Sequence, residues 1–172
     1  ARTLAEERAG RVSDLGYDVA FDLPAVRTEP VRGRFGAPFV LEDEGRPLAF
    51  DFRQAPDKVI AVEANGNAVE AGLVNGHVVI PEGALVEGAN AVSIEFVAGD
   101  EALNRREDFL YALFVPARAS LTLPVMDQPD LKARWTLTLT LPKGWNALSN
   151  GREAGRVGAA DRQTFTFAVT VP

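Results

Sequence analysis

Few residues in this chain of 172 residues have types and spacing that could do chemistry. The single histidine, His77, follows a predicted turn, whereas zinc centres usually take two or three imidazoles or imidazole–carboxylate sets. Cysteine is absent, which excludes disulfides, thiolate metal sites and a thiol nucleophile. We therefore expect no catalytic residue and no metal ligand in this chain, and interpret His77 as a strand-edge residue that meets solvent.

Two further groups of side chains allow a functional and a structural interpretation. The acidic run 42–44 lies at a predicted hairpin tip, where carboxylates could hold calcium, but the spaced oxygen ligands of a dedicated loop are missing. A solvated turn is the preferred interpretation. Trp135 and Trp145 could form a sugar-stacking platform, although Trp135 is in phase with Leu137 and is predicted to be core. The sequence leaves Trp145 undecided.

Composition limits the class of protein. The formal net charge is −6, from 24 acidic and 18 basic side chains, so neither nucleic acid nor an anionic membrane surface is an expected partner. Hydrophobic residues make up 47% of the chain, which suffices for a core. A run of about 18 apolar residues, as a membrane helix needs, is absent. We predict one domain over residues 1–172.

Hydrophobic periodicity then gives the elements that must position any site. A short helix is predicted over residues 1–15, where Leu4, Arg8 and Val12 form one row. The following chain alternates apolar and polar residues, which indicates half-buried strands at 17–23, 48–52, 92–96, 135–141 and 164–171. Asn-Gly pairs at 65–66, 75–76 and 150–151 predict hairpin turns. The fold class is therefore all-β: mainly antiparallel layered sheets, as in a sandwich or saddle, with a short N-terminal helix.

One long composite pattern goes beyond this. Residues 110–151, LYALFVPARASLTLPVMDQPDLKARWTLTLTLPKGWNALSNG, resemble the N-terminal domain of the aminopeptidase N family of zinc metallopeptidases. The family's usual Phe-Pro-Cys-Phe is replaced by residues 123–126, Leu-Pro-Val-Met, which keeps the apolar character without the thiol. The positions that match the family pattern include Arg118, Pro124, Asp127, Gln128, Pro129, Lys132, Asn150 and Gly151.

Most of this pattern has a structural interpretation. Asp127 could cap backbone N–H groups at a helix or turn start, where Pro129 would occupy the first turn. We expect Arg118 or Lys132 to pair with the Asp127 carboxylate. Asn150-Gly151 is expected to close a hairpin, so these residues are interpreted as scaffold more readily than as substrate contacts.

Tyr111 is the candidate substrate-binding residue. In many members of the family a Gln seven positions before the motif arginine lines the pocket for the substrate's first side chain, and that position holds Tyr111 here. The resemblance implies that its ring and hydroxyl could meet a substrate's N-terminal residue. A core or interface tyrosine is the alternative.

The resemblance implies a division of labour. In the family a following catalytic domain carries His-Glu-x-x-His and a further Glu as zinc site and general base, and this sequence lacks that motif. We therefore expect a non-catalytic domain that docks on its own catalytic domain, walls one side of the cleft, and presents residues 103–116 to the N-terminal end of a peptide substrate. The full-length protein, with zinc, would then release N-terminal amino acids from peptides.

Two other hypotheses remain open. The chain could be a free-standing β-sandwich that binds a glycan or a protein, or it could belong to an inactive paralogue with an unrelated second domain. The stretch LNRREDFLYALFVPARA looks most like bacterial members, some of which are exported. The compartment stays open between the bacterial envelope or periplasm, which is slightly favoured, and the cytoplasm.

Overall fold

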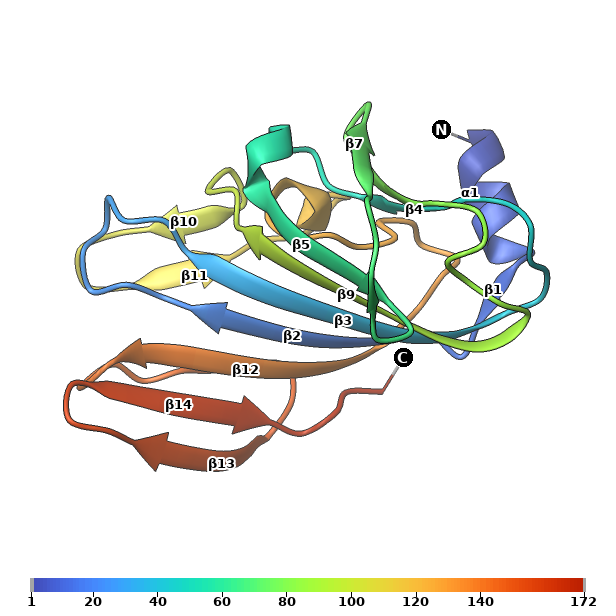
Figure 1. The fold of residues 1–172 in the computed structure, drawn as a ribbon. Helices are drawn as coiled ribbons and strands as arrows, with labels where there is room; N and C mark the ends of the chain where they lie inside the picture. The colour runs from blue at the N-terminus through green and yellow to red at the C-terminus, as the bar shows by residue number, and fades with distance from the viewer. Residues whose placement is uncertain (1, 172) are drawn as a thin grey trace.

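The computed structural model describes residues 2–171 and is built around one large curved sheet (Figure 1). Its strand order is β13-β14-β12-β2-β3-β9-β5-β6, and the short β1 pairs with β3. These strands are β1 (Val12–Ser13), β2 (Gly16–Asp22), β3 (Arg32–Leu41), β5 (Val59–Ala64), β6 (Asn67–Ala68), β9 (Gly88–Val97), β12 (Arg134–Pro142), β13 (Glu153–Gly158) and β14 (Arg162–Phe167). The predicted all-β class is confirmed.

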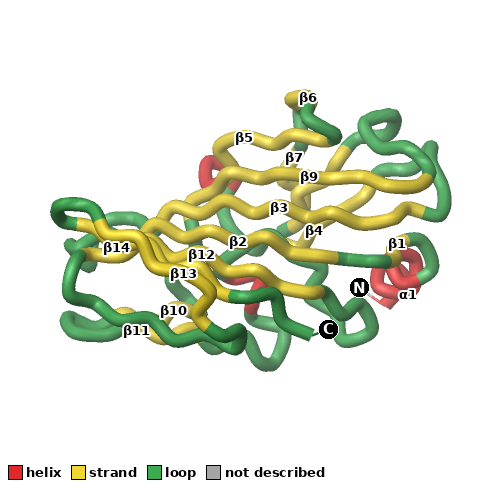
Figure 2. Tube along the Cα trace, turned by 90° about the horizontal axis from the view of Figure 1, so that it is seen from below, coloured by secondary structure: helices red, strands yellow, loops and turns green. Residues whose placement is uncertain are grey.

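The pairing is antiparallel throughout this sheet except between β2 and β12, which run parallel. A parallel neighbour needs a long crossover, and the chain between the end of β2 and the start of β12 forms β3, β5, β6 and β9 of this sheet together with elements outside it. The views in Figures 1 and 2 show the consequence: the C-terminal strands β12, β14 and β13 extend the sheet that the N-terminal strands begin.

A smaller sheet covers one face of the large one. It has the order β4-β8-β7, with β4 (Leu48–Asp51), β7 (Gly72–Val74) and β8 (His77–Ile80). The rings of Phe50 on β4 and Phe35 on β3 lie 5.7 Å apart, and those of Phe52 and Phe96 lie 5.6 Å apart. These four rings are fully buried. The apolar residues of the alternating strands therefore form one aromatic core between the two sheets.

Two of the three Asn-Gly pairs form the predicted hairpin turns. Asn65 and Gly66 have φ angles of 51° and 79°, and Asn75 and Gly76 have 50° and 77°. Both turns therefore place two consecutive residues in the left-handed region, as a two-residue hairpin with the twist of its strands requires.

The N-terminal helix is shorter than predicted. Helix α1 spans Arg2–Ala9, not residues 1–15, and Val12 already belongs to β1. Val12 and Ser13 pair with Leu41 and Val40 of β3, and the Val12 side chain is buried. The sheet pairing and burial of Val12 therefore outweighed the helical periodicity, which is a local preference only.

A two-stranded hairpin and two 3-10 turns complete the described elements. A separate hairpin is formed by β10 (Leu103–Arg105) and β11 (Leu110–Ala112), and two 3-10 turns, η1 and η2, span Pro56–Lys58 and Ala119–Leu121. Between residues 2 and 171, no helix has both the length and the apolar character that crossing a bilayer requires.

Candidate functional site

The hairpin β10–β11 contains Tyr111 and presents apolar side chains to solvent. Register pairs Asn104 with Tyr111, and Leu110 turns inward to contact the core. Four large apolar side chains at every second position from 109 to 115, in β11 and on either side of it, are about half exposed or more. Such a run of exposed apolar side chains is unusual. We call this set the hairpin row: Phe109 (49%), Tyr111 (52%), Leu113 (49%) and Val115 (73%).

The aromatic pair in the hairpin row is ordered by stacking. The rings of Phe109 and Tyr111 lie 6.3 Å apart with an angle of 17° between their planes. The charged residues 106–108 at the tip of the hairpin are exposed beside them. The alternation of large apolar residues from 109 to 115 was a signal in the sequence that pointed to this surface, although only Tyr111 was singled out from it.

The base of the hairpin is tied to the body of the protein. The Leu113 amide donates to the Ala102 carbonyl at 3.1 Å, and the Arg118 guanidinium donates to the Glu101 carbonyl at 2.5 Å. Arg105 donates to the carbonyl of Glu29 at 3.0 Å, in the loop that joins β2 and β3. Figure 1 shows the hairpin at that end of the large sheet. The hairpin row therefore stands on an anchored base.

The acidic corner at Asp127 is a joint, but with partners other than those predicted. Its carboxylate accepts the backbone N–H of Ser120 at 3.1 Å, within η2, so it caps a turn that precedes it in sequence. Its own N–H donates to the carboxylate of Asp51 at 2.9 Å. The capping role of Asp127 is thus observed, although the capped turn is not the one expected at Pro129.

The predicted pairing of Arg118 or Lys132 with Asp127 is not found. Among the ion pairs of residues 2–171, none joins either cation to Asp127. Arg118 instead bonds the Glu101 carbonyl, and Lys132 is exposed. Closeness in sequence did not decide the partner, because η2 turns the chain between Arg118 and Asp127.

The neighbouring motif residues also hold the corner. The Gln128 amide donates to the Ala5 carbonyl of helix α1 at 2.9 Å and to Asp130 at 3.0 Å. Pro124 is buried, while Pro129 lies in an exposed turn and not at the start of a helix. The motif thus joins the corner to the N-terminal helix, a contact across 123 residues that the sequence did not predict.

The third Asn-Gly pair does not form the predicted two-residue hairpin turn. Neither Asn150 nor Gly151 has a positive φ, and they lie in the connection between β12 and β13. A Cβ atom on Gly151 would lie 2.3 Å from the Ala168 carbonyl oxygen. Glycine is needed here for close approach of two backbones and not for turn conformation.

His77 was expected to meet solvent at a strand edge, and it has a specific partner instead. Its Nε2 lies 3.1 Å from Oδ1 of Asp51, and its side chain is 31% exposed. Asp51 is also held by both terminal nitrogens of Arg8, at 2.8 and 2.9 Å. Asp51 was not singled out from the sequence, since a carboxylate in an otherwise ordinary strand carries no local signal.

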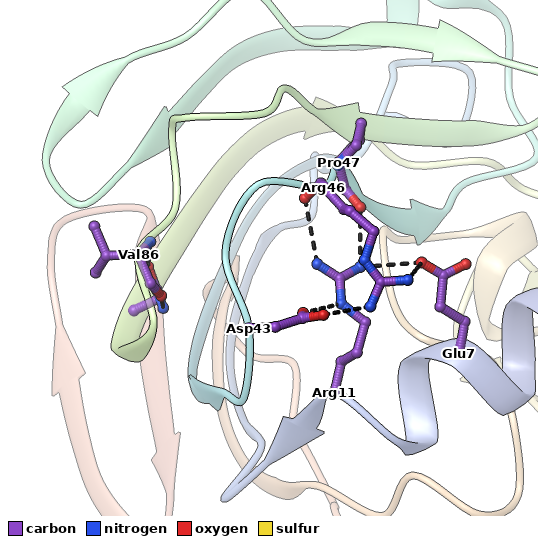
Figure 3. Close-up of polar contacts among 7 residues, drawn as sticks. Glu7, Arg11, Asp43, Arg46, Pro47 and Val86 are labelled. Carbon is purple, nitrogen blue, oxygen red and sulfur yellow. Dashed lines mark hydrogen bonds and ion pairs between the residues drawn. The ribbon is translucent and has the colours of Figure 1, made fainter.

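The acidic run 42–44 is a turn between two sheets and not a hairpin tip, because β3 and β4 belong to different sheets. Asp43 accepts from Arg11 at 2.5 Å and also pairs with Arg46, as Figure 3 shows. The Arg46 guanidinium, followed by that of Arg11, lowers the pKa of the Asp43 carboxyl. Two cations at one carboxylate favour an ion-pair network over a calcium site.

The tryptophans do not form a shared exposed platform. Trp135 is partly buried, with its ring 5.0 Å from that of Tyr17 at an angle of 83°. Trp145 is also partly buried and lines a small cavity with Leu110 and Arg105. That cavity has a volume of about 20 Å³, enough for a water molecule and not for a sugar.

In the described part of the chain, the side chains that could bind a metal ion do not cluster. Within residues 2–171, no three side chains among His, Asp and Glu gather as metal ligands would. A second concavity of about 270 Å³ lies over Gly36 and Ser93 on the outer face of the large sheet. The described residues therefore offer an exposed apolar hairpin and hydrogen-bonded corners.

Comparison with known proteins relates this geometry to a family. Residues 101–172 match the model described as the peptidase M1 N-terminal domain. A curated aminopeptidase N of Haemonchus contortus is 42% identical over 57 residues, which are 32% of this chain and 6% of that protein. The aligned part is therefore a small fraction of the relative's length.

Solved structures share the fold over almost the whole chain. The M1 zinc metallopeptidase of Deinococcus radiodurans matches with a TM-score of 0.76 and 17% identity, over 91% of this chain and 38% of that one. Legionella pneumophila aminopeptidase A in complex with aspartic acid matches with a TM-score of 0.80 and 15% identity, over 91% and 19%. This chain spans less than half the length of either protein.

Proposed function

We propose that this chain, whose residues 101–172 match the peptidase M1 N-terminal domain, is a non-catalytic module that docks on the catalytic domain of a zinc aminopeptidase. The match to the family model supports the resemblance read from the sequence, and the docking role is the step beyond it. In this proposal the full-length protein releases N-terminal amino acids from peptides, and this domain shapes one side of the cleft.

The observation that carries the proposal is the hairpin row. Four large apolar side chains are about half exposed or more on a hairpin with an anchored base, which is unfavourable in water unless another surface covers them. Four side chains fall short of the ~800 Å² per partner that a stable association of separate molecules buries. A tethered domain needs less area, because the linkage gives it a high effective concentration.

Tyr111 would contribute positioning and not proton transfer. Its ring stacks with Phe109 while its side chain remains 52% exposed, so the ring presents an apolar face together with a hydroxyl. Next to a catalytic cleft, such a surface can orient the N-terminal end of a peptide and exclude water. We propose that Tyr111 contacts the substrate, in the position where relatives of the sequence family carry a Gln.

Zinc does not fit the described residues of this chain. The one imidazole, His77, pairs with the Asp51 carboxylate, which Arg8 already holds with two hydrogen bonds. A zinc site takes three or four ligands in tetrahedral arrangement. In the proposal the metal and the hydrolytic step belong to the rest of the full-length protein, and we expect this chain alone to bind no zinc and cleave no aminoacyl anilide.

The test uses two valines of equal exposure in the full-length protein. Val115 in the hairpin row and Val157 on the edge strand β13 are both 73% exposed. Val115→Thr places a hydroxyl in the proposed interface, so we expect kcat/KM on an aminoacyl anilide to fall about three- to tenfold. Val157→Thr serves as the matched control and should leave kcat/KM unchanged.

Equal effects of the two substitutions on kcat/KM, or none, would argue against docking through the hairpin row. A second measurement addresses the free-standing binding module. A shift of tryptophan fluorescence when glycans are added to this chain, present in Trp135→Phe and combined with unchanged kcat/KM in Val115→Thr, would favour that module and place the contact at Trp145.

A further inference from the structure

Asp51 lies where three elements meet. It ends β4, its side chain is 18% exposed, and it accepts both terminal nitrogens of Arg8 from helix α1. Its second neighbour is His77 on β8, and its third is the backbone N–H of Asp127. Asp51 also exchanges two backbone hydrogen bonds with Val125, at 2.6 and 3.1 Å. One carboxylate therefore fixes the corner relative to the helix and the small sheet.

Hydrogen bonds continue from this corner towards the hairpin. Asp127 accepts the Ser120 N–H at 3.1 Å. Arg53, two residues beyond Asp51, donates from its backbone to the Ser120 carbonyl at 2.8 Å and from its side chain to the Ser120 hydroxyl at 2.9 Å. The Arg53 guanidinium also reaches the Ala117 carbonyl at 2.5 Å.

The connection ends at the hairpin base. Arg118, adjacent to Ala117, bonds the Glu101 carbonyl before β10, and its N–H donates to the Phe114 carbonyl at 2.9 Å. Asp51, the last residue of β4, and Arg53, two residues after it, thus hold the chain from 117 to 127 through hydrogen bonds. We call this set the Asp51 network: Arg8, Asp51, Arg53, Ala117, Ser120 and Asp127.

We propose that Asp51 is a positioning residue for the hairpin row: through the Asp51 network, the docking of helix α1 holds the base of β10–β11 in place. The coupling between helix α1 and the hairpin base does not depend on the proposed function. Only the use of that coupling, to position the hairpin row for docking, rests on the proposed function. Arg8 is 3% exposed, so loss of the Asp51 charge leaves a buried guanidinium without its counter-ion and weakens the bond to the Asp127 N–H.

The test measures amide hydrogen exchange in this chain. In Asp51→Asn, the amides of Leu113 and Arg118 should exchange about tenfold faster than in the parent, because opening of the hairpin base becomes easier. Both amides donate to backbone carbonyls at the hairpin base, so each reports directly on its opening.

Asp43→Asn is the matched control. Asp43 also pairs with a buried arginine of the N-terminal segment, Arg11. Both belong to a network in the turn 42–47, where Arg11 also bonds the Arg46 carbonyl, and not to the corner at Asp127. Exchange is compared at equal distance from each variant's urea midpoint, so that global destabilisation cancels. Asp43→Asn should leave the exchange at Leu113 and Arg118 unchanged.

A second variant and a double variant separate coupling from a local defect. Arg8→Lys keeps the charge and loses the two-pronged bond, so it tests the same link if Asp51→Asn folds poorly. Arg53→Gln combined with Arg8→Lys should show less than the sum of their separate effects on exchange, since both act through one connection. Additive effects, or equal acceleration in Asp43→Asn, overturn the proposal.

The outcomes also distinguish the inference from the proposed function. Selective acceleration in Asp51→Asn together with unchanged kcat/KM for Val115→Thr in the full-length protein supports the coupling and argues against docking. If exchange in Asp51→Asn is not accelerated while kcat/KM falls in Val115→Thr, the result supports docking and argues against the coupling.

Discussion

The Tyr17 hydroxyl accepts the backbone N–H of Met126 at 3.0 Å, across 109 residues of sequence. The ring of Tyr17 lies 5.0 Å from both Phe35 and Trp135, and the residue is 4% exposed. This bond joins the first long strand of the large sheet to the corner that carries the family motif. Tyr17 is therefore a structural tyrosine, whereas Tyr111 is exposed on the hairpin.

This difference predicts opposite responses of the two tyrosines to loss of the hydroxyl. Tyr17→Phe keeps the ring but leaves the buried Met126 N–H without an acceptor, so the free energy of unfolding should fall by about 1–3 kcal/mol. Tyr111→Phe should change it by less than about 0.5 kcal/mol. Urea denaturation measures both, and equal losses would contradict the assignment.

Alkaline titration gives a second prediction for Tyr17. Burial is the largest cause that raises its phenol pKa far above the ordinary value, partly offset by the Met126 hydrogen bond. The folded state then holds the proton more tightly than the unfolded state. The stabilisation is full below the unfolded pKa of about 10 and declines as pH rises towards the folded pKa.

The variant Tyr111→Phe makes Tyr17 the only tyrosine, so phenolate absorbance reports on it alone. Phenolate should not form in the folded protein near pH 10 and should appear together with unfolding at higher pH, followed by circular dichroism. Titration with a midpoint near pH 10 in a folded chain would show that Tyr17 is accessible to solvent.

The network at Asp43 predicts a dependence on acid. Arg46 and Arg11 lower the folded pKa of Asp43, so its contribution to stability is present above the unfolded pKa of about 4 and is lost as pH falls through the folded pKa. Asp43→Asn should lower the Tm at pH 7, and the Tm difference from the parent should shrink below pH 4. The exposed neighbour Glu44, changed to Gln, is the control; a Tm difference that persists unchanged at pH 2 would refute the electrostatic origin.

Gly151 gives a prediction about backbone approach. A Cβ on Gly151 would meet the Ala168 carbonyl oxygen at 2.3 Å, whereas a Cβ on Gly158 meets nothing within 4 Å. Gly151→Ala should therefore cost about 1–3 kcal/mol of unfolding free energy, because neither backbone can move without disturbing β13 or β14. Gly158→Ala should be neutral or slightly stabilising by comparison. Urea denaturation of the pair checks this, and equal stabilities would show that the connection yields freely.

Local patterns were sufficient for much of the fold. Period-two alternation placed β2, β4, β9 and β12 closely, because the side chains of a strand half buried in a sheet reflect their surroundings directly. Two Asn-Gly turns followed from conformation alone. The predicted extent of the N-terminal helix was wrong, because pairing with β3 takes Val12 into a strand. The predicted turn at the third Asn-Gly pair was also wrong, because close approach to Ala168 decides the role of Gly151.

The sequence by itself determined the all-β class and the likeness to part of the aminopeptidase N family, and it predicted a capping role for the Asp127 carboxylate. Only the tertiary structure decided which side chains meet there: Ser120 and Asp51 at Asp127, His77 and Arg8 at Asp51, and a stacked Phe109 beside Tyr111. The physical reason is that strand patterns depend on near neighbours along the chain. A carboxylate's partner, in contrast, depends on which segments the sheets bring within about 3 Å, and a linear sequence holds no local record of that.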